Sequence, residues 1–245
     1  MILRLIYSIY ALLVFIILML LVLPLVFVSL FFNEVKRGNS IYKICKLWAF
    51  IWYLMVGIRH KTLNEALPEP DRHYIFVANH ISYLDITSIV LSINQPYRVL
   101  GKAEMIRYPI FGWIYKAAVI LVDRSNARAR EKSVRALSAA LNKGISVFIF
   151  PEGTFNETDK PLKSFYDGAF RLAIQTKTPI KPVLFLDTHK RLHFNSIFSL
   201  KPGVSRTVFL PEIKIDGYTS NNVIELKEKV FQVMNDGLKR FADNG

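Results

Sequence analysis

The feature that most restricts how this chain can fold is an apolar run near its N-terminus. No charged residue occurs from Leu5 to Asn33, and the stretch from Leu12 to Leu23 is almost purely aliphatic. A helix of about 20 apolar residues covers a hydrocarbon core about 30 Å thick, so this run predicts a membrane helix. Because Pro24 lacks a backbone N–H donor, we expect either one kinked span or a helix that turns back within the leaflet.

The flanks of the run predict that it is retained and which way the remaining chain faces. A cleavable signal peptide would have a shorter apolar run, a more basic start and a small-residue cleavage site, and none of these occurs before Asn33. Arg4 is the one basic residue before the run, and four basic residues follow it closely: Lys36, Arg37, Lys43 and Lys46. This bias predicts a membrane location with the rest of the chain on the cytoplasmic face.

A second apolar stretch, Leu47–Ile58, is too short to span a bilayer. It is rich in aromatic residues that favour the headgroup zone of a membrane: Trp48, Phe50, Trp52 and Tyr53. We therefore expect an interfacial helix here, with a buried core helix of the soluble domain as the alternative.

Composition and charge limit the classes of partner. Hydrophobic residues make up 52% of the 245 residues, and the formal net charge is +13. The mean hydropathy of +0.28 excludes a disordered tail, and the charge favours anionic partners, namely lipid surfaces, phosphate-bearing substrates or nucleic acid. Cys45 is the single cysteine, which excludes an intrachain disulfide framework and fits a reducing compartment.

The chain divides into a membrane anchor with its interfacial helix, residues 1–60, and a soluble domain, residues 61–245. No internal repeat or Gly/Ser linker interrupts the second part, so one domain is expected. Short runs rich in Val, Ile and Phe alternate there with helical patterns, which predicts an α/β fold with helices against a sheet. The expected strands are Tyr74–Ala78, Arg98–Leu100, Val119–Val122, Ser146–Phe150, Lys181–Leu186 and Thr207–Leu210.

Two helices of the soluble domain can be placed from their patterns. Asn126 can cap a helix that closes at Gly144, and this helix would complete a strand-helix-strand unit. Its apolar face would consist of Val134, Leu137 and Leu141. The segment Ser220–Phe241 has the same kind of periodicity and predicts a surface helix of structural function.

A histidine and a carboxylate follow the first expected strand, in the sequence Asn79-His80-Ile81-Ser82-Tyr83-Leu84-Asp85. In a continuous helix these two side chains would point about 140° apart, so a bend is needed to bring them together. If His80 lies in a loop and Asp85 in the first turn of a helix, the carboxylate can fix the tautomer and leave the other ring nitrogen as a base. Taken alone, such a pair is more often a capping or core hydrogen bond.

Arg124 follows the apolar strand Val119–Val122, where its guanidinium would lie at the edge of the sheet. A guanidinium can hold a phosphate with two parallel hydrogen bonds, which makes Arg124 a candidate binding residue. The alternative is a surface arginine that pairs with Asp123 or another acid.

The sequence Phe150-Pro151-Glu152-Gly153-Thr154 follows another expected strand. Pro151 ends the strand, Gly153 permits a close approach of the backbone, and the polar side chains could bind a ligand. A plain turn often has this composition. A fourth segment, Thr178–Val183, is expected to be a rigid entry into a strand.

Together and in this order, the motifs resemble those of the glycerolipid acyltransferase family, and among its members the 1-acylglycerol-3-phosphate acyltransferases. The resemblance runs from about Asn79 to Val183 and includes the stretch Gly101-Lys102-Ala103-Glu104. It implies a mixed, largely parallel sheet flanked by helices, behind an N-terminal membrane anchor.

The resemblance also implies a reaction and its residues. His80 would remove the proton from the sn-2 hydroxyl of 1-acylglycerol-3-phosphate, Asp85 would orient His80, and the acyl group would come from acyl-CoA or acyl carrier protein to give phosphatidic acid. The acceptor would be bound by Arg124, Glu152, Gly153 and Thr154, with Lys102 as a further candidate. Neither a cofactor nor a metal is implied, and the partners would be the lysolipid, the acyl donor and membrane lipids.

The chain departs from the family pattern at two places. Family members often carry a basic or small polar residue after the Phe-Pro-Glu-Gly-Thr motif, where this chain has Phe155-Asn156. A glycine that is common before the arginine motif is here Ala118. The first departure leaves another lysophospholipid, or a lyso-amino-acid lipid, as an alternative acceptor.

Two other classes of function are weaker alternatives. Asp187, His189 and His193 include a His pair at i, i+4 spacing that could bind zinc in a metal hydrolase, although the Glu of a His-Glu-x-x-His motif is missing. The net charge alone would also fit a membrane-tethered module that binds nucleic acid or anionic lipid. No RNA-recognition signature, phosphate-binding loop or serine elbow occurs, so no nucleic acid, ATP or dinucleotide is expected.

Overall fold

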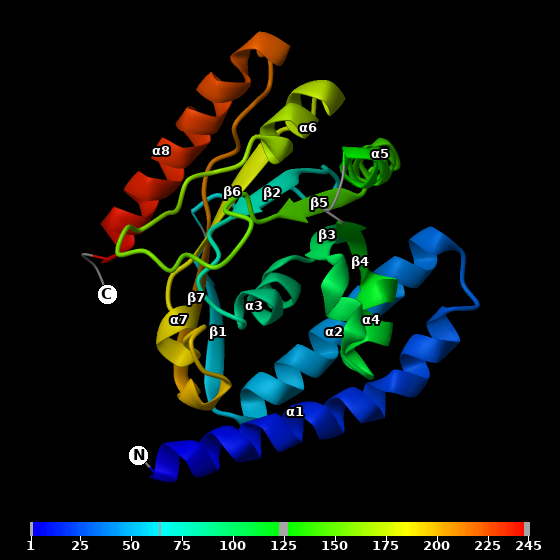
Figure 1. The fold of residues 1–245 in the computed structure, drawn as a ribbon, viewed down its shortest axis with the longest axis vertical. Helices are drawn as coiled ribbons and strands as arrows, with labels where there is room; N and C mark the ends of the chain where they lie inside the picture. The colour runs from blue at the N-terminus through cyan, green and yellow to red at the C-terminus, as the bar shows by residue number, and fades with distance from the viewer. Residues whose placement is uncertain (1, 64, 123–126, 243–245) are drawn as a thin grey trace.

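The computed structural model describes residues 2–63, 65–122 and 127–242 of the chain. Its seven strands form one sheet in the order β1-β7-β6-β2-β5-β3-β4 (Figure 1). The strands are β1 (Ile58–Leu63), β2 (Ile75–Ala78), β3 (Tyr97–Lys102), β4 (Val119–Val122), β5 (Ser146–Ile149), β6 (Ile180–Phe185) and β7 (Gly203–Phe209). The helices are α1 (Ile2–Ser29), α2 (Glu34–Met55), α3 (Asp85–Ser92), α4 (Phe111–Ala118), α5 (Ala127–Asn142), α6 (Gly168–Thr176), α7 (Thr188–Arg191) and α8 (Val223–Ala242), with short 3-10 turns η1 (Ala103–Arg107), η2 (Ile197–Ser199) and η3 (Ser220–Asn222).

The direction of the strands determines where functional loops can meet. β6, β2, β5, β3 and β4 run parallel to one another, and β7 and β1 are parallel to each other but antiparallel to that group. This confirms the mixed, largely parallel sheet. Because five neighbouring strands end at the same edge, the segments that follow them gather there, as in other open α/β sheets.

All six predicted strands are present, and β4 has the predicted bounds. β1 was not predicted. Its charged residues Arg59 and Lys61 interrupt the apolar pattern, because β1 is an edge strand that pairs with β7 alone. The sheet therefore begins at Ile58, within the part of the chain expected to form the membrane anchor.

Alternate residues of the central strands point to opposite faces of the sheet and form two apolar layers. Ile75 and Val77 of β2 pack in a core with α5, α6 and α8, whereas Phe76 and Ala78 pack in a second core with α1 to α4. All four side chains are fully buried. Helices thus cover both faces, which explains why these strands read as continuous apolar runs.

The two predicted helices of the soluble domain are present. α5 ends before Gly144, whose φ of +71° is the left-handed conformation that favours glycine at this position. Leu137 and Leu141 are buried as predicted, but Val134 is 37% exposed. The proposed cap, Asn126, lies outside the described residues. The predicted C-terminal helix, Ser220–Phe241, is formed by the 3-10 turn η3 followed by α8, which begins at Val223.

α1 and α2 form an antiparallel hairpin that packs on the domain. α1 is unbroken through Pro24, and the chain reverses after Ser29. The indole N–H of Trp52 donates to the carbonyl of Ala11 at 2.9 Å, and the ring of Phe15 lies between Trp48 and Trp52.

The interfacial position predicted for these aromatic residues is wrong for Trp52 and Tyr53, which are 4% and 2% exposed. Both lie in the apolar cluster that includes Ala11, as the buried-helix alternative predicts. Phe50 of α2 is 59% exposed. The helix is also longer than predicted, because Asn33 caps it through a hydrogen bond from Lys36 N–H.

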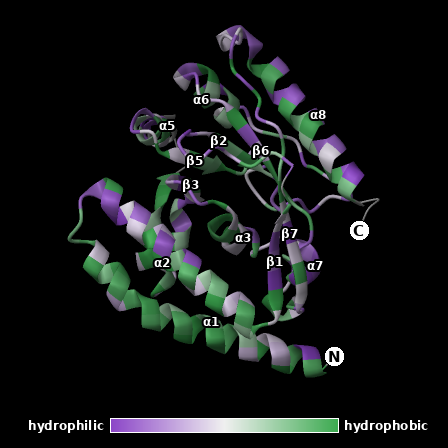
Figure 2. Ribbon diagram, turned by 180° about the vertical axis from the view of Figure 1, so that it is seen from behind, coloured by the Kyte–Doolittle hydropathy of each residue, from purple (hydrophilic) through white to green (hydrophobic). Residues whose placement is uncertain are grey.

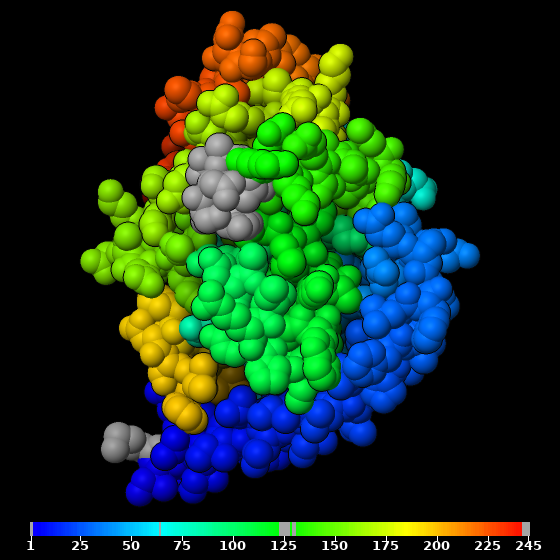
Figure 3. All heavy atoms as spheres, turned by 45° about the vertical axis from the view of Figure 1, so that its right-hand side comes forward, coloured from blue at the N-terminus to red at the C-terminus, as the bar shows by residue number. Residues whose placement is uncertain are grey.

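The ribbon of α1 is green over nearly its whole length, whereas α2 is mixed in hydropathy (Figure 2). Exposed apolar side chains extend along α1 from Ile2 to Val28 and recur near the end of α2, at Leu47, Phe50, Leu54 and Met55. Among the described residues, α1 is the one helix long and apolar enough to cross a membrane, with a mean hydropathy of 3.3. α1 contacts the domain near both of its ends. The guanidinium of Arg4 donates to the carbonyl oxygen of Ser199 at 2.7 Å, and the ring centroids of Phe27 and Trp113 are 6.0 Å apart. Figure 3 shows α1 in dark blue along the lower edge of the molecule, beneath the gold segment near residues 188–201.

Candidate active site

The residues singled out from the sequence follow neighbouring parallel strands. His80 comes after β2, Lys102 ends β3 and Glu152 comes after β5. These three strands are neighbours in the order β2-β5-β3 and end at the same edge. Arg124 follows the adjacent strand β4, but it lies outside the described residues. The topology therefore collects the motifs at the edge where open α/β sheets bind ligands.

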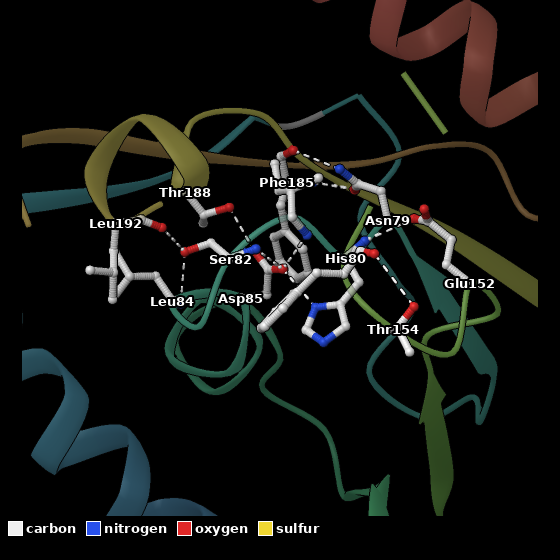
Figure 4. A network of polar contacts seen from close by, with 12 residues as sticks. Asn79, His80, Ser82, Leu84, Asp85, Glu152, Thr154, Phe185, Thr188 and Leu192 are labelled. Atoms are coloured by element: carbon white, nitrogen blue, oxygen red, sulfur yellow. Dashed lines mark hydrogen bonds and ion pairs between the residues drawn. The ribbon is translucent and has the colours of Figure 1, made fainter. Parts of the chain in front are cut away.

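The predicted contact between His80 and Asp85 is confirmed. Nδ1 of His80 lies 2.9 Å from Oδ2 of Asp85, and the chain bends between them because His80 lies in a loop and α3 begins at Asp85 (Figure 4). The same oxygen accepts the backbone N–H groups of Ile81 at 2.7 Å and Ser82 at 2.9 Å. The other oxygen, Oδ1, accepts the hydroxyl of Thr188 at 2.6 Å. The carboxylate is fully buried, and all of these groups donate to it.

The loop that carries His80 is tied to the sheet by Asn79. Its side-chain N–H donates to the carbonyl of Phe185 at 2.9 Å, and its carbonyl accepts the N–H of Phe185 at 2.8 Å. This pair of bonds continues the β2–β6 ladder one residue beyond the strand. Ser82 fixes the far side of the loop, since its hydroxyl donates to the carbonyl of Leu192 at 2.6 Å.

Two aromatic rings enclose the imidazole of His80. The ring stacks on Phe150 with centroids 3.9 Å apart, and Phe155 approaches it with centroids at 4.3 Å. The side chain of His80 is 17% exposed. Nε2 points away from Asp85 (Figure 4). Phe155, at which the chain departs from the family pattern, thus forms one wall of the site.

Glu152 lies beneath the site and does not face its open side. The residue is fully buried, and its two carboxylate oxygens accept the backbone N–H groups of His80 and Lys163, each at 2.9 Å. Burial raises the pKa of Glu152 to about 7, against the opposing effect of these two hydrogen bonds. The expectation that Glu152 binds the acceptor finds no exposed atom in this geometry, because the side chain is fully buried and each oxygen already accepts a backbone N–H. In this geometry it positions the His80 loop.

The rest of this motif is divided between the interior and the surface. Gly153 is buried with a φ of +73°, the left-handed conformation that favours glycine. Thr154 is exposed, and its hydroxyl oxygen accepts a hydrogen bond from Nζ of Lys163 at 2.8 Å. Lys102 is exposed at the end of β3. Gly153, Thr154 and Lys102 thus remain available as candidate binding residues.

The candidate zinc ligands are not gathered into one site. Asp187 forms two hydrogen bonds with the guanidinium of Arg206, at 2.7 and 2.9 Å. His189 and His193 are not on one helix, because α7 ends at Arg191. Within residues 2–63, 65–122 and 127–242, no group of three or more His, Cys, Asp or Glu residues is arranged to hold a metal ion.

Sequence reasoning missed several residues of this network. Thr188 and Lys163 are far from Asp85 and Glu152 along the chain, and only the fold brings each pair together. Asn79 and Ser82 stand within the quoted motif, but their roles depend on Phe185 and Leu192.

Comparisons with known proteins bear on this site. The acyltransferase family model matches residues 59–186. A chloroplastic 1-acyl-sn-glycerol-3-phosphate acyltransferase of Brassica napus is 32% identical over 67% of this chain, and a 1-acyl-sn-glycerol-3-phosphate acyltransferase of Haemophilus influenzae is 27% identical over 80% of it. The matched region covers 48% of the Brassica protein and 80% of the Haemophilus protein, so the chain spans about half the length of the plant relatives it matches.

The fold also has a solved counterpart. The crystal structure of the 1-acyl-sn-glycerophosphate acyltransferase PlsC of Thermotoga maritima superposes with a TM-score of 0.79 and covers 98% of both chains. Sequence identity between the two is 21%, so this similarity concerns the architecture. It includes the N-terminal helices as well as the sheet, because nearly the whole of each chain is matched.

Proposed function

The chain belongs to the acyltransferase family, and we propose that it transfers a fatty acyl group from a thioester donor to the sn-2 hydroxyl of 1-acylglycerol-3-phosphate, which gives phosphatidic acid. The donor is acyl-CoA or acyl carrier protein. The similarity to the Brassica and Haemophilus enzymes supports this acceptor. The alternative acceptor is another lysolipid, because Phe155 stands where family members often carry a polar residue.

The observation that carries the proposal is the geometry of His80 and Asp85. A proton on Nδ1 is held by the buried carboxylate at 2.9 Å, which leaves the lone pair of Nε2 directed away from Asp85 and free to accept a proton. Nε2 removes the proton of the lysolipid hydroxyl while the oxygen attacks the thioester carbonyl carbon. The tetrahedral intermediate then expels the thiolate, which takes the proton from the imidazolium. Acyl transfer is complete without a covalent enzyme intermediate or a cofactor.

Other residues position the reactants. We assign the acceptor's phosphate and glycerol to Arg124, Lys102 and Thr154, with the backbone of Gly153 close by. Glu152 acts indirectly, because it holds the His80 loop through the backbone N–H. Holding the hydroxyl beside the thioester makes the reaction effectively unimolecular, which is a large part of the rate enhancement in such transfers.

The helical hairpin supports catalysis at a membrane surface. Contacts between α1 and the domain extend from Arg4 to Phe27, so the helix lies along the domain. We therefore infer that α1 enters one leaflet with its outer face and does not cross the bilayer, and that the basic residues after it keep the domain on the cytoplasmic face. Both the lysolipid and its product partition into bilayers, where this position meets them at high local concentration.

The test is an acyl-transfer assay with the purified full-length chain in lipid vesicles. Several lysolipids are crossed with acyl-CoA and acyl carrier protein as donors, and His80→Ala is the control. We expect phosphatidic acid from the wild type and a loss of at least about 100-fold in kcat from the variant, with vesicle binding unchanged. Undiminished transfer by His80→Ala would refute the mechanism. Turnover with a different lysolipid, and none with 1-acylglycerol-3-phosphate, would show that the proposed acceptor is wrong.

A further inference from the structure

Lys163 carries an ammonium group beside Thr154, and neither the family motifs nor the sequence patterns identified it. Its Nζ donates to the hydroxyl oxygen of Thr154 at 2.8 Å. Among residues 2–63, 65–122 and 127–242, no carboxylate oxygen lies within ion-pairing distance of this ammonium. The residue is partly buried, but the hydrogen bond of its ammonium to Thr154 is exposed, so the charge is accessible to a ligand from solvent.

The position of Lys163 relative to His80 is fixed by the backbone. Glu152 accepts the N–H groups of both residues on its two oxygens, so one buried carboxylate joins the two loops. The N–H of Asn156 donates to the carbonyl of His80 at 2.7 Å, so the segment 152–156 runs beside the histidine. Thr154 is at the middle of this segment, so the ammonium that bonds to it is held next to the segment that runs beside His80.

We propose that Lys163 binds a phosphate group of a substrate and so determines specificity for a phosphorylated acyl acceptor or donor. This inference rests on the proposed function, because it assigns a further ligand to the same site. A lysine beside a threonine hydroxyl offers a positive charge and a hydrogen-bond donor to the same anion. The acceptor's phosphate and the phosphates of the donor share this chemistry, and substrates that lack one or the other distinguish them.

The test compares Lys163→Met, which removes the charge, with Lys163→Arg, which keeps it. Lys160→Met is the matched control, because Lys160 is exposed on the same loop. All three variants retain the backbone N–H that holds Glu152. A lost charge-assisted hydrogen bond predicts a rise of about tenfold or more in KM for the phosphorylated substrate, with kcat changed less than about threefold. Lys163→Arg, which keeps the charge, should restore part of the affinity that Lys163→Met loses, and Lys160→Met should stay near the wild type.

Four substrates identify the source of the phosphate. If it belongs to the acceptor, the effect of Lys163→Met is seen with 1-acylglycerol-3-phosphate and disappears with monoacylglycerol. If it belongs to the donor, the effect is seen with acyl-CoA and disappears with a short acyl thioester that lacks phosphate. Unchanged KM values for both substrates, or a drop in kcat alone, would overturn the inference.

Binding without turnover keeps this result separate from the proposed function. Calorimetric titration of each full-length variant with 1-acylglycerol-3-phosphate and, separately, with CoA in detergent micelles requires no catalysis. We expect Lys163→Met to bind one of these ligands about tenfold more weakly than Lys160→Met. Equal affinities for both ligands would refute the role of Lys163. A wild type that binds but transfers no acyl group would instead refute the proposed reaction.

Discussion

The buried carboxylate of Glu152 accepts the backbone N–H of His80 at 2.9 Å, and its second oxygen accepts the N–H of Lys163 at the same distance. One side chain thus holds both the histidine loop and the loop that brings Lys163 to Thr154. This arrangement makes the buried carboxylate a positioning group for both loops.

Glu152→Gln should destabilise the protein and slow catalysis. A glutamine has one acceptor oxygen, so its amide N–H₂ must face one of the two backbone N–H donors and leave that donor unpaired. We expect a loss of about 1–3 kcal/mol in the free energy of unfolding. Urea unfolding and kcat are the measurements, and Glu157→Gln on the same loop, which is exposed, is the control. A variant as stable as this control would show that the two bonds are unimportant.

Glu152 should also make stability depend on pH. Its pKa rises from the ordinary 4.5 to about 7 in the folded protein because of burial, so the folded state binds the proton more tightly than the unfolded state. The associated stability is fully present below pH 4.5 and is lost as the pH rises through 7. The shift corresponds to about 3 kcal/mol. Unfolding free energies from pH 4.5 to 8 should fall more steeply for the wild type than for Glu152→Gln. Parallel curves would contradict the assignment.

His60 should make the free energy of unfolding depend on pH in the opposite direction to Glu152. Burial, with a smaller effect from Lys46, lowers the pKa of His60 from 6.5 to about 4. Stability is therefore fully present above pH 6.5 and is lost as the pH falls through 4, because the unfolded chain takes up the proton first. In His60→Gln, whose side chain can still hydrogen-bond to Ser92, the free energy of unfolding should fall less than in the wild type as the pH is lowered. The measurement is the difference in free energy of unfolding between the wild type and His60→Gln from pH 4 to 7. A difference that stays constant over this range would contradict the prediction.

Thr188→Val should reduce kcat more than it alters either KM. The threonine hydroxyl donates to Oδ1 of Asp85 at 2.6 Å, so its removal leaves the carboxylate with its three N–H donors on Oδ2. We expect a loss of about tenfold in kcat and a shift in the pH profile of kcat, since a charge-assisted hydrogen bond orients the partner of His80. Thr188→Ser should restore most of the rate. An unchanged pH profile would show that Thr188 supports the fold alone.

The outer face of α1 should determine binding to membranes. Leu13, Ile17 and Leu21 are 55%, 55% and 66% exposed, and replacing all three by Gln removes apolar area without disturbing the core. Because each side chain contributes about 1.5–3 kcal/mol when buried, we expect the partition coefficient to fall by more than tenfold. Vesicle flotation measures this, and Ile224→Gln on α8, with an equally exposed apolar side chain, is the control. Equal flotation of the triple variant and the control would argue against the anchor.

The sequence by itself determined the local features. Apolar strands such as Ile75–Ala78 and Ser146–Ile149 were predictable because a strand buried on both faces needs a continuous apolar run. The bend between His80 and Asp85 was predictable because five residues of helix would separate their side chains. β1 was not predictable from its apolar pattern, since the exposed Arg59 and Lys61 interrupt that pattern on an edge strand, where charge is tolerated.

Only the tertiary structure decided which polar groups work together. Whether Glu152 faces a ligand or the interior depends on Lys163, and the support of Asp85 depends on Thr188, 103 residues away. The burial of Trp52 likewise depends on α1, whose carbonyl of Ala11 accepts its N–H. Apolar periodicity is recorded in neighbouring residues, whereas a buried polar group is satisfied by whichever donor the chain topology brings to it.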